Sequence, residues 1–261
     1  MADEGLKRAK EIAALIGGAN ADELDQYERR YAEDSRKQVR NALSRARRRL
    51  ERERQEQERV IGLYAEQRKL GGEGIVIGVD EVGRGAVAGP LTVAAVALPL
   101  EPIVWGINDS KQLTPSRRES LAQEIEHTAT AIGIAHIEPG VIDRKGMAAC
   151  LRMAMAEAIE SAAVEPDCVL IDGNPVHVHP KEKCVVKGDA RIACIAAASI
   201  VAKVTRDALM VEYSSWYPEY HLDSCKGYAS AEHVEAIRTY GLSEIHRVSF
   251  CGNLVETPRL F

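Results

Sequence analysis

The chain has 261 residues, 46% of them hydrophobic and 28% charged, so a soluble globular protein with a sizeable core is expected. It contains no apolar run of 18 residues and no basic N-terminal segment followed by a long apolar block, so we expect neither a membrane span nor a secretory signal. Six cysteines without a CxxC pair favour reduced thiols and a cytoplasmic location. A net charge of −5 indicates no general affinity for nucleic acid, so such binding would need local patches.

Residues 1–72 are predicted to be a charged helical N-terminal extension. Residues 1–70 carry 17 Lys and Arg against 14 Asp and Glu, and they contain no proline. Opposite charges spaced four residues apart over residues 35–60 are typical of a long helix. Apolar positions are too sparse for a separate core, so we expect helices, packed loosely or joined flexibly at "LGGEG". The basic cluster of Arg45, Arg47, Arg48 and Arg49 could contact phosphates, although a solvated helix face is the favoured interpretation.

Residues 73–261 have the pattern of an α/β domain. Apolar runs over residues 75–80, 90–99 and 129–139 predict strands, and a helix capped by Thr114 with Pro115 at its first turn lies between the last two. Further strands are expected near residues 166–173 and 183–189. Further helices are expected at 140–163, 190–218 and 230–241. Consecutive strands followed by alternating strands and helices favour a mixed sheet flanked by helices.

Acidic residues follow three of these strands. Asp80, Asp172 and Asp189 each come at the end of an apolar strand, and Glu81 is adjacent to the first. Because α/β sheets gather strand ends at one edge, these carboxylates are expected to lie together. Oxygen-only ligands suit Mg²⁺ or Mn²⁺, and two such ions about 3.5–4 Å apart activate water for phosphoryl transfer. The pattern therefore predicts metal-dependent phosphodiester hydrolysis.

Two loops are suited to a phosphate-bearing substrate. Arg84 lies between Gly83 and Gly85, where a backbone without side chains lets N–H groups meet a phosphate or a sugar directly. Ser110 and Lys111 lie just before a predicted helix N-terminus, which favours anion binding.

Other candidate substrate-binding residues come later in the chain. Ser199, Lys203 and Arg206 share one face of the Ala-rich helix, where a solvated face is an equal alternative. Lys187 precedes the Gly-Asp step, and Tyr228 lies in "CKGYAS". The tyrosine could stack on a sugar or donate its hydroxyl, or it could be a tyrosine at a buried edge.

The motifs "GVDEVGRGAVAGP", "NDSKQL", "VLIDGN", "VVKGDARIACIAAASIVAKVTRD", "CKGYAS" and "HRVSF" occur in that order over residues 74–251. Together they closely resemble type 2 ribonuclease H, the ribonuclease HII family. The resemblance implies a ribonuclease H-like fold, with a mixed five-stranded sheet flanked by helices and a small C-terminal helical region. It also implies divalent-metal-dependent cleavage of the RNA strand in RNA–DNA hybrids and of DNA duplexes that contain single ribonucleotides. The products would carry a 3′-hydroxyl and a 5′-phosphate.

The resemblance carries particular roles to particular residues. It implies that the metal ligands are the four carboxylates Asp80, Glu81, Asp172 and Asp189. Asp207 is a rival for the fourth place, but the family places that ligand after the Lys-Gly step. The Gly83–Gly85 turn resembles the element that reads the 2′-hydroxyl of the ribonucleotide. Tyr228 matches the tyrosine that packs on the adjacent deoxyribose at the RNA–DNA junction.

Some features depart from the family pattern or leave alternatives open. His177 and His179 invite a zinc interpretation, although a surface loop is favoured. The C-terminal "PRLF" resembles, weakly, peptides that dock on the replication sliding clamp. A type 3 ribonuclease H is the nearest rival, but its N-terminal extension is a compact α/β domain. A binding module that does not cut is disfavoured, because bare carboxylates repel phosphates.

Overall fold

The computed structural model describes residues 8–254, which fall into two compact units on either side of the Arg59–Val60 bond. The helices of the first unit, with the long helix that continues into the second, are α1 (Ala9–Gly18), α2 (Ala21–Arg30) and α3 (Lys37–Gly71). The remaining helices are α4 (Pro115–Thr128), α5 (Pro139–Lys145), α6 (Met147–Ser161), α7 (Ala193–Trp216), α8 (Leu222–Cys225) and α9 (Ala231–Tyr240). The strands are β1 (Val76–Val82), β2 (Leu91–Ala97), β3 (Ala131–Ile137), β4 (Cys168–Asp172) and β5 (Glu182–Val185).

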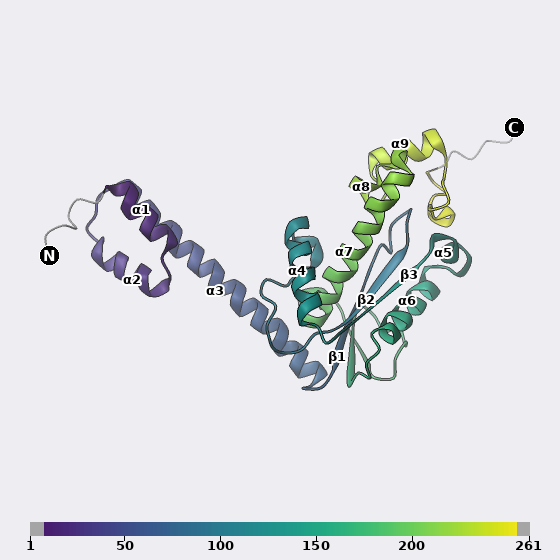
Figure 1. Cartoon of the computed structure of the whole chain (residues 1–261), viewed down its shortest axis with the longest axis horizontal. Coiled ribbons are helices and arrows are strands. Elements are labelled where there is room, and N and C mark those ends of the chain that lie inside the picture. The colour runs from purple at the N-terminus through teal and green to yellow at the C-terminus, as the bar shows by residue number, and fades with distance from the viewer. Residues whose placement is uncertain (1–7, 255–261) are drawn as a thin grey trace. The chain divides into compact units, whose positions relative to one another are not determined.

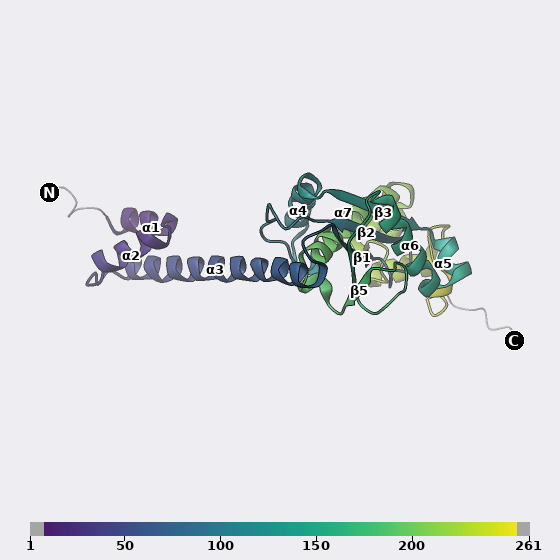
Figure 2. The same cartoon turned by 90° about the horizontal axis from the view of Figure 1, so that it is seen from below.

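The first unit has a small core, contrary to the expectation from its sparse apolar residues. Helices α1 and α2 lie beside the first part of α3 (Figure 2). The buried apolar side chains between them are Ile12, Ile16, Ala19, Leu24, Val39 and Ala46. Three of these six side chains, Ile12, Ile16 and Leu24, come from α1 and α2, and the count of apolar positions along α3 did not include them. The predicted helical character of this region is confirmed.

The second compact unit begins at Val60, inside α3. Val60, Leu63 and Tyr64 are buried in the core of the α/β unit. Gln67 is also buried there, where its side chain donates to Leu98 O (2.8 Å) and accepts from Cys194 N (2.8 Å). The last turns of α3 are thus part of the α/β core, and "LGGEG" is a short connection from α3 to β1.

The second unit is a five-stranded mixed sheet in the order β3-β2-β1-β4-β5. β1 pairs antiparallel with β2 and parallel with β4, so the two central strands β1 and β4 end at the same edge. Helices α4 and α7 cover one face and α5 and α6 cover the other (Figure 1). The predicted ribonuclease H-like architecture is confirmed.

Gly78 lets α7 approach the middle of β1. A Cβ atom at this position would lie 2.1 Å from the carbonyl carbon of Cys194, closer than any real contact. Because neighbouring side chains on a strand alternate between faces, Asp80 points to the same face as Gly78 and lies under α7. The glycine therefore sets the distance between α7 and the end of β1.

Two elements differ from the prediction. The single helix expected over residues 140–163 is split into α5 and α6 at Gly146, whose φ of +78° interrupts the helix. Asp189 does not end a strand, because β5 stops at Val185 and Asp189 lies in a 3₁₀ turn over Gly188–Ala190. Within residues 8–254, no helix combines the length and apolarity that crossing a membrane requires.

Candidate active site

Asp80 and Glu81 occupy the carboxyl end of β1, the central strand. Their alternation places Asp80 toward α7 and Glu81 toward α6. Asp80 is only 6% exposed and accepts a hydrogen bond from the Glu81 N–H (2.8 Å). The Glu81 carboxylate lies 3.6 Å from the guanidinium of Arg84. The two adjacent carboxylates therefore lie on opposite faces of the sheet at this edge.

Asp172 ends β4, the parallel neighbour of β1. Its Oδ1 accepts a hydrogen bond from Gly188 N (2.6 Å), which ties the end of β4 to the 3₁₀ turn that carries Asp189. Asp189 reaches the same edge by this turn rather than by a strand end. The four carboxylates that the sequence singled out are thus brought to one edge.

The pKa values of Asp80, Glu81 and Asp189 are all raised at this edge. The pKa of Asp80 is raised well above its usual value by burial, with the charges of Glu81 and Asp172 adding to the effect. Burial likewise raises the pKa of Glu81, where Arg84 opposes the shift and Asp172 adds to it. Burial and the charge of Asp172 raise the pKa of Asp189. The edge therefore carries more negative than positive charge, and a divalent cation would offset the excess.

The donor chemistry fits such a cation, since carboxylate oxygens are the hard ligands that Mg²⁺ and Mn²⁺ prefer. In the part of the chain that the structure describes, no three His, Cys, Asp or Glu side chains are already arranged to hold a metal ion. One oxygen each of Asp80 and Asp172 is engaged with a backbone N–H instead.

Ser110 and Ser199 lie behind Asp80 and are both nearly inaccessible, at 3% and 4% exposed. Their hydroxyl oxygens are 3.0 Å apart, and the Ser199 hydroxyl hydrogen-bonds the Asp80 carboxylate. Lys111 follows on the surface. Burial lowers its pKa, but the charges of Asp109 and of the acidic edge outweigh this and raise it. The serines hold Asp80, and Lys111 is the nearby cation.

Tyr228, Lys203 and Lys111 line a hollow beside Glu81 on the α7 face. Tyr228 is 36% exposed, which decides between the two interpretations of its sequence in favour of an accessible ring. Lys203 is held by an ion pair with Asp207 (2.8 Å), so Asp207 supports the helix face and does not join the four carboxylates.

The Gly83–Gly85 turn is held from below by Arg247, which is fully buried. Arg247 donates to Gly83 O (2.7 Å), to Arg84 O (3.3 Å) and, through two nitrogens, to Gly89 O (3.0 and 2.8 Å). A peptide group points its N–H opposite to its C=O. With the carbonyls of Gly83 and Arg84 turned inward, the N–H groups of Arg84 and Gly85 are turned outward. The sequence analysis identified Arg247 only as part of the "HRVSF" motif.

Arg206 corrects one of the predicted substrate contacts. Its side chain has no exposed surface and donates to the carbonyls of Pro90 (2.9 Å), Lys226 (2.8 Å) and Ala88 (3.0 Å). Its guanidinium also lies 5.5 Å from the ring centroid of Tyr228. Helical spacing placed Arg206 beside Lys203, but the segment over residues 86–90 and the "CKGY" loop cover it. Arg206 therefore supports Tyr228 and the glycine turn instead of meeting substrate.

A chain of two buried histidines runs from Tyr228 to Ser243. Tyr228 O can only accept, so His233 Nδ1 donates to it (2.9 Å). His233 Nε2 then accepts from His246 Nε2 (3.1 Å), and His246 Nδ1 accepts from Ser243 N (3.0 Å). Both rings are therefore neutral with fixed tautomers. Burial and the neighbouring His233 lower the pKa of His246 to about 4.

This chain predicts acid sensitivity of the fold. The folded-state pKa of His246 lies below the ordinary value of 6.5, so the unfolded chain binds more protons between pH 6.5 and about 4. The stability contribution is complete above pH 6.5 and is lost as the pH falls, by up to about 3 kcal/mol. Urea unfolding of wild type and His246→Gln across this range should show a shallower acid loss in the variant. Parallel curves would contradict the assignment.

The remaining candidates lie at the surface. Lys187 is exposed and adopts a left-handed conformation (φ +57°) immediately before the turn that carries Asp189. His177 and His179 lie in the loop between β4 and β5, and the His177 side chain is 86% exposed. This agrees with the favoured surface-loop interpretation.

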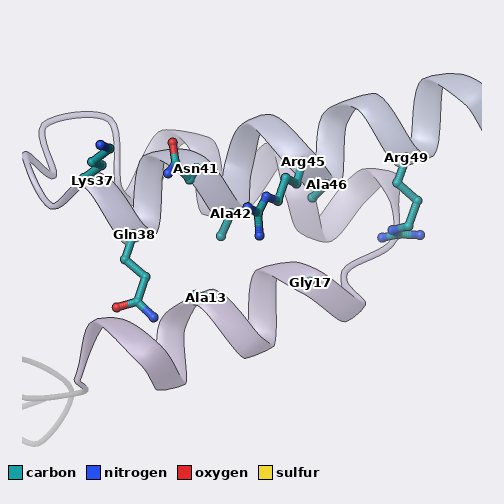
Figure 3. A pocket seen from close by; sticks show the side chains of 9 residues that line it. All are labelled: Ala13, Gly17, Lys37, Gln38, Asn41, Ala42, Arg45, Ala46 and Arg49. Atoms are coloured by element: carbon teal, nitrogen blue, oxygen red, sulfur yellow. The ribbon is translucent and has the colours of Figure 1, made fainter.

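The first unit has a groove of its own between α1 and α3 (Figure 3). Lys37, Asn41, Arg45 and Arg49 follow one another at four-residue spacing along it, and small residues on both helices leave the space open. Arg49 donates to Ala19 O (2.5 Å), which leaves Lys37 and Arg45 as the accessible cations of the groove. Of the other predicted basic residues, Arg47 is paired with Glu28.

Family models match both parts of the chain. The family model "Ribonuclease HII" matches residues 77–253, and the model "Ribonuclease HII N-terminal domain" matches residues 9–71. The chain is 38% identical to ribonuclease HII of Bacillus cytotoxicus over 247 residues, or 94% of each chain.

Solved structures share the fold of the second unit. Ribonuclease H2 of Pyrococcus horikoshii superposes with a TM-score of 0.59 at 27% identity, covering 69% of this chain and 96% of that one. Ribonuclease HII of Archaeoglobus fulgidus, solved in complex with PCNA, gives a TM-score of 0.57 at 27% identity, covering 67% and 94%. The match to the N-terminal model of this family, with a helical first unit, also disfavours the type 3 alternative. The chain belongs to the ribonuclease HII family and is an enzyme of the ribonuclease H class.

Proposed function

We propose that this protein hydrolyses the RNA strand of RNA–DNA hybrids and cuts on the 5′ side of single ribonucleotides in duplex DNA, leaving a 3′-hydroxyl and a 5′-phosphate. One observation supports the proposal above all: four carboxylates, the Gly83–Gly85 turn with its outward N–H groups, and the accessible Tyr228 lie at one edge of the sheet. Each of these groups belongs to a motif shared with the family.

The carboxylates Asp80, Glu81, Asp172 and Asp189 would hold Mg²⁺ or Mn²⁺. When bound, the metal supplies an activated water and stabilises the leaving oxygen. The residues of this chain orient the substrate around that chemistry. Ser199 holds Asp80 in place, and Lys111 and Lys203 attract the charged backbone of the cut strand.

Recognition of the ribonucleotide is assigned to the Gly83–Gly85 turn and Tyr228. The outward N–H groups of the turn can bond the 2′-hydroxyl, the local feature of the sugar that separates RNA from DNA. A site built to hydrogen-bond this hydroxyl rejects a sugar that lacks it, because its donors are then left unpaired. Tyr228 would pack on the deoxyribose that follows.

The test is cleavage by wild type of three duplexes: DNA with one ribonucleotide, a long RNA–DNA hybrid, and DNA alone, each with Mg²⁺ or Mn²⁺. We expect cutting 5′ of the single ribonucleotide and cutting of the hybrid, with no cutting of DNA. If only the hybrid is cut, the role of Tyr228 at the junction fails and a type 3 activity is favoured. If no duplex is cut, the proposal fails and a binding function is favoured.

The groove of the first unit is proposed to hold the duplex backbone. Lys37→Ala combined with Arg45→Ala should weaken hybrid affinity and reduce the slope of log K against log [salt] by about two, because two phosphate contacts are lost. The matched control is Arg40→Ala with Arg48→Ala, which removes the same charge from residues of α3 that do not line the groove. Equal slopes for the two double variants would refute the role of the groove.

Two smaller proposals concern location and partners. A cytoplasmic location is supported by six free cysteines, since thiols stay reduced there. A weak contact with a sliding clamp is suggested by the archaeal complex with PCNA. The "PRLF" segment that prompted this expectation lies outside the described residues.

A further inference from the structure

A second hollow borders the acidic edge on the α6 face, opposite the hollow of Tyr228. It has a volume of about 630 Å³, enough for a sugar–phosphate unit. The two hollows have only Glu81 in common. The α6-face hollow is lined by Glu81, Arg84, Asp172 and side chains of α6 and the β4–β5 loop, including Arg152, Asn174 and His177.

The loop that forms one wall of this hollow is held in shape. The Glu182 carboxylate accepts hydrogen bonds from the N–H groups of His177 (2.8 Å), Val178 (2.7 Å) and His179 (3.3 Å). These bonds lower the pKa of Glu182 despite its burial, so the anchor stays charged. His177 is therefore presented from a fixed part of the wall, and Asn174 also lines the hollow.

Arg152 adds a positive charge to this hollow from the middle of α6, in addition to Arg84, which lies beside Glu81. Arg152 is exposed, and no residue in the described range 8–254 forms an ion pair with it. Glu81 and Asp172 line the same hollow, but neither is paired with Arg152. The Arg152 guanidinium is therefore available to bind an anion. The carboxylates themselves would repel a phosphate without such a cation.

We propose that this hollow binds a backbone phosphate of the cut strand on the 5′ side of the cleavage point, with Arg152 as the charged contact and Asn174 as a neutral donor. The inference rests on the proposed function, in which Tyr228 takes the nucleotide on the 3′ side. A strand that crosses the sheet edge above Glu81 then leaves one hollow and enters the other. Arg152 and Asn174 position the strand and do not touch the reacting atoms.

The experiment measures binding of a fluorescein-labelled DNA duplex with one ribonucleotide, with Ca²⁺ in place of Mg²⁺, across a range of salt. Arg152→Ala should weaken binding by about three- to tenfold and reduce the log–log salt slope by about one. Asn174→Ala should weaken binding without changing the slope, because it removes no charge. The matched control Arg144→Ala removes an exposed arginine of α5 that does not line the hollow and should change neither.

A duplex series with one uncharged methylphosphonate linkage locates the contact. A linkage on the 5′ side should weaken binding by wild type but have no further effect on Arg152→Ala. Suppose that wild type cuts the unmodified duplex with one ribonucleotide, while the salt slopes of Arg152→Ala and Arg144→Ala are equal. The inference is then overturned and the proposed function stands. A methylphosphonate effect confined to the 3′ side would also overturn it. If wild type does not cut the duplex with one ribonucleotide, both the proposed function and this inference fail.

Discussion

Asp80→Asn is expected to lower the cleavage rate at least about a thousandfold, because the proposed metal site would lose a ligand and with it several kcal/mol of transition-state stabilisation. The fold should not be weakened. Asp80 is buried beside Glu81 and within reach of the charge of Asp172, so removing its charge relieves repulsion. The Asn side chain keeps an oxygen for the Glu81 N–H.

Two measurements separate this result from unfolding. The thermal midpoint of the metal-free variant should equal or exceed that of wild type. The rise in midpoint on adding Mg²⁺ should be smaller in the variant, since ligand binding stabilises only the state that binds it. Asp207→Asn is the control: it breaks the ion pair with Lys203 and should keep cleavage within about tenfold. Equal losses in the two variants would contradict the assignment of the four carboxylates.

Arg247→Ala is expected to be the most destabilising single change near the site. It leaves the carbonyls of Gly83, Arg84 and Gly89 without their buried donor. Each unsatisfied buried group costs about 1–3 kcal/mol, so a total loss on the order of 3–5 kcal/mol is expected in urea unfolding. Arg247→Met fills most of the volume and should recover only the packing part of the loss.

The same change should also affect recognition. With the carbonyls released, the Gly83–Gly85 turn loses its orientation, and discrimination between a ribonucleotide and a deoxyribonucleotide should fall along with the cutting rate. Arg238→Ala is the matched control, because this exposed arginine of α9 pairs only loosely with Glu235 (3.8 Å). It should cost less than about 0.5 kcal/mol. A similar cost for both variants would show that Arg247 does not hold the turn.

Two buried arginines, Arg206 and Arg247, hold together the loops around the site. Arg206 and Arg247 are bonded to backbone carbonyls rather than to carboxylates, and burial lowers the pKa of both. Their donors converge on the segment over residues 83–90 and on the "CKGY" loop. Val87 N and Ala88 N also donate to Gly227 O (2.9 and 3.1 Å). The glycine turn and the "CKGY" loop are thus one connected structure, although Arg84 and Tyr228 are 144 positions apart in the sequence.

The sequence alone predicted most of the helices and strands, and it singled out four carboxylates as candidate metal ligands. Apolar runs ending in Asp80 and Asp172 predicted strands with carboxylates at one edge, because strand ends of an α/β sheet meet there. The Thr114 cap and the long helices followed from local patterns, which depend only on near neighbours. The motifs also indicated the family, which the family models confirm.

Tertiary structure decided what surrounds those carboxylates. Helical spacing placed Arg206 beside Lys203, but only the segments packed over α7 show that Arg206 is buried and Lys203 is not. Arg247 bonds residues more than 150 positions earlier in the sequence, and the two histidines that bond each other are 13 positions apart. No local sequence pattern encodes contacts at these separations. The hollow of Arg152 likewise exists only because α6 packs beside the β4–β5 loop. Burial and long-range hydrogen bonds are properties of the packed chain, so they separate the residues that support the site from those that can meet substrate.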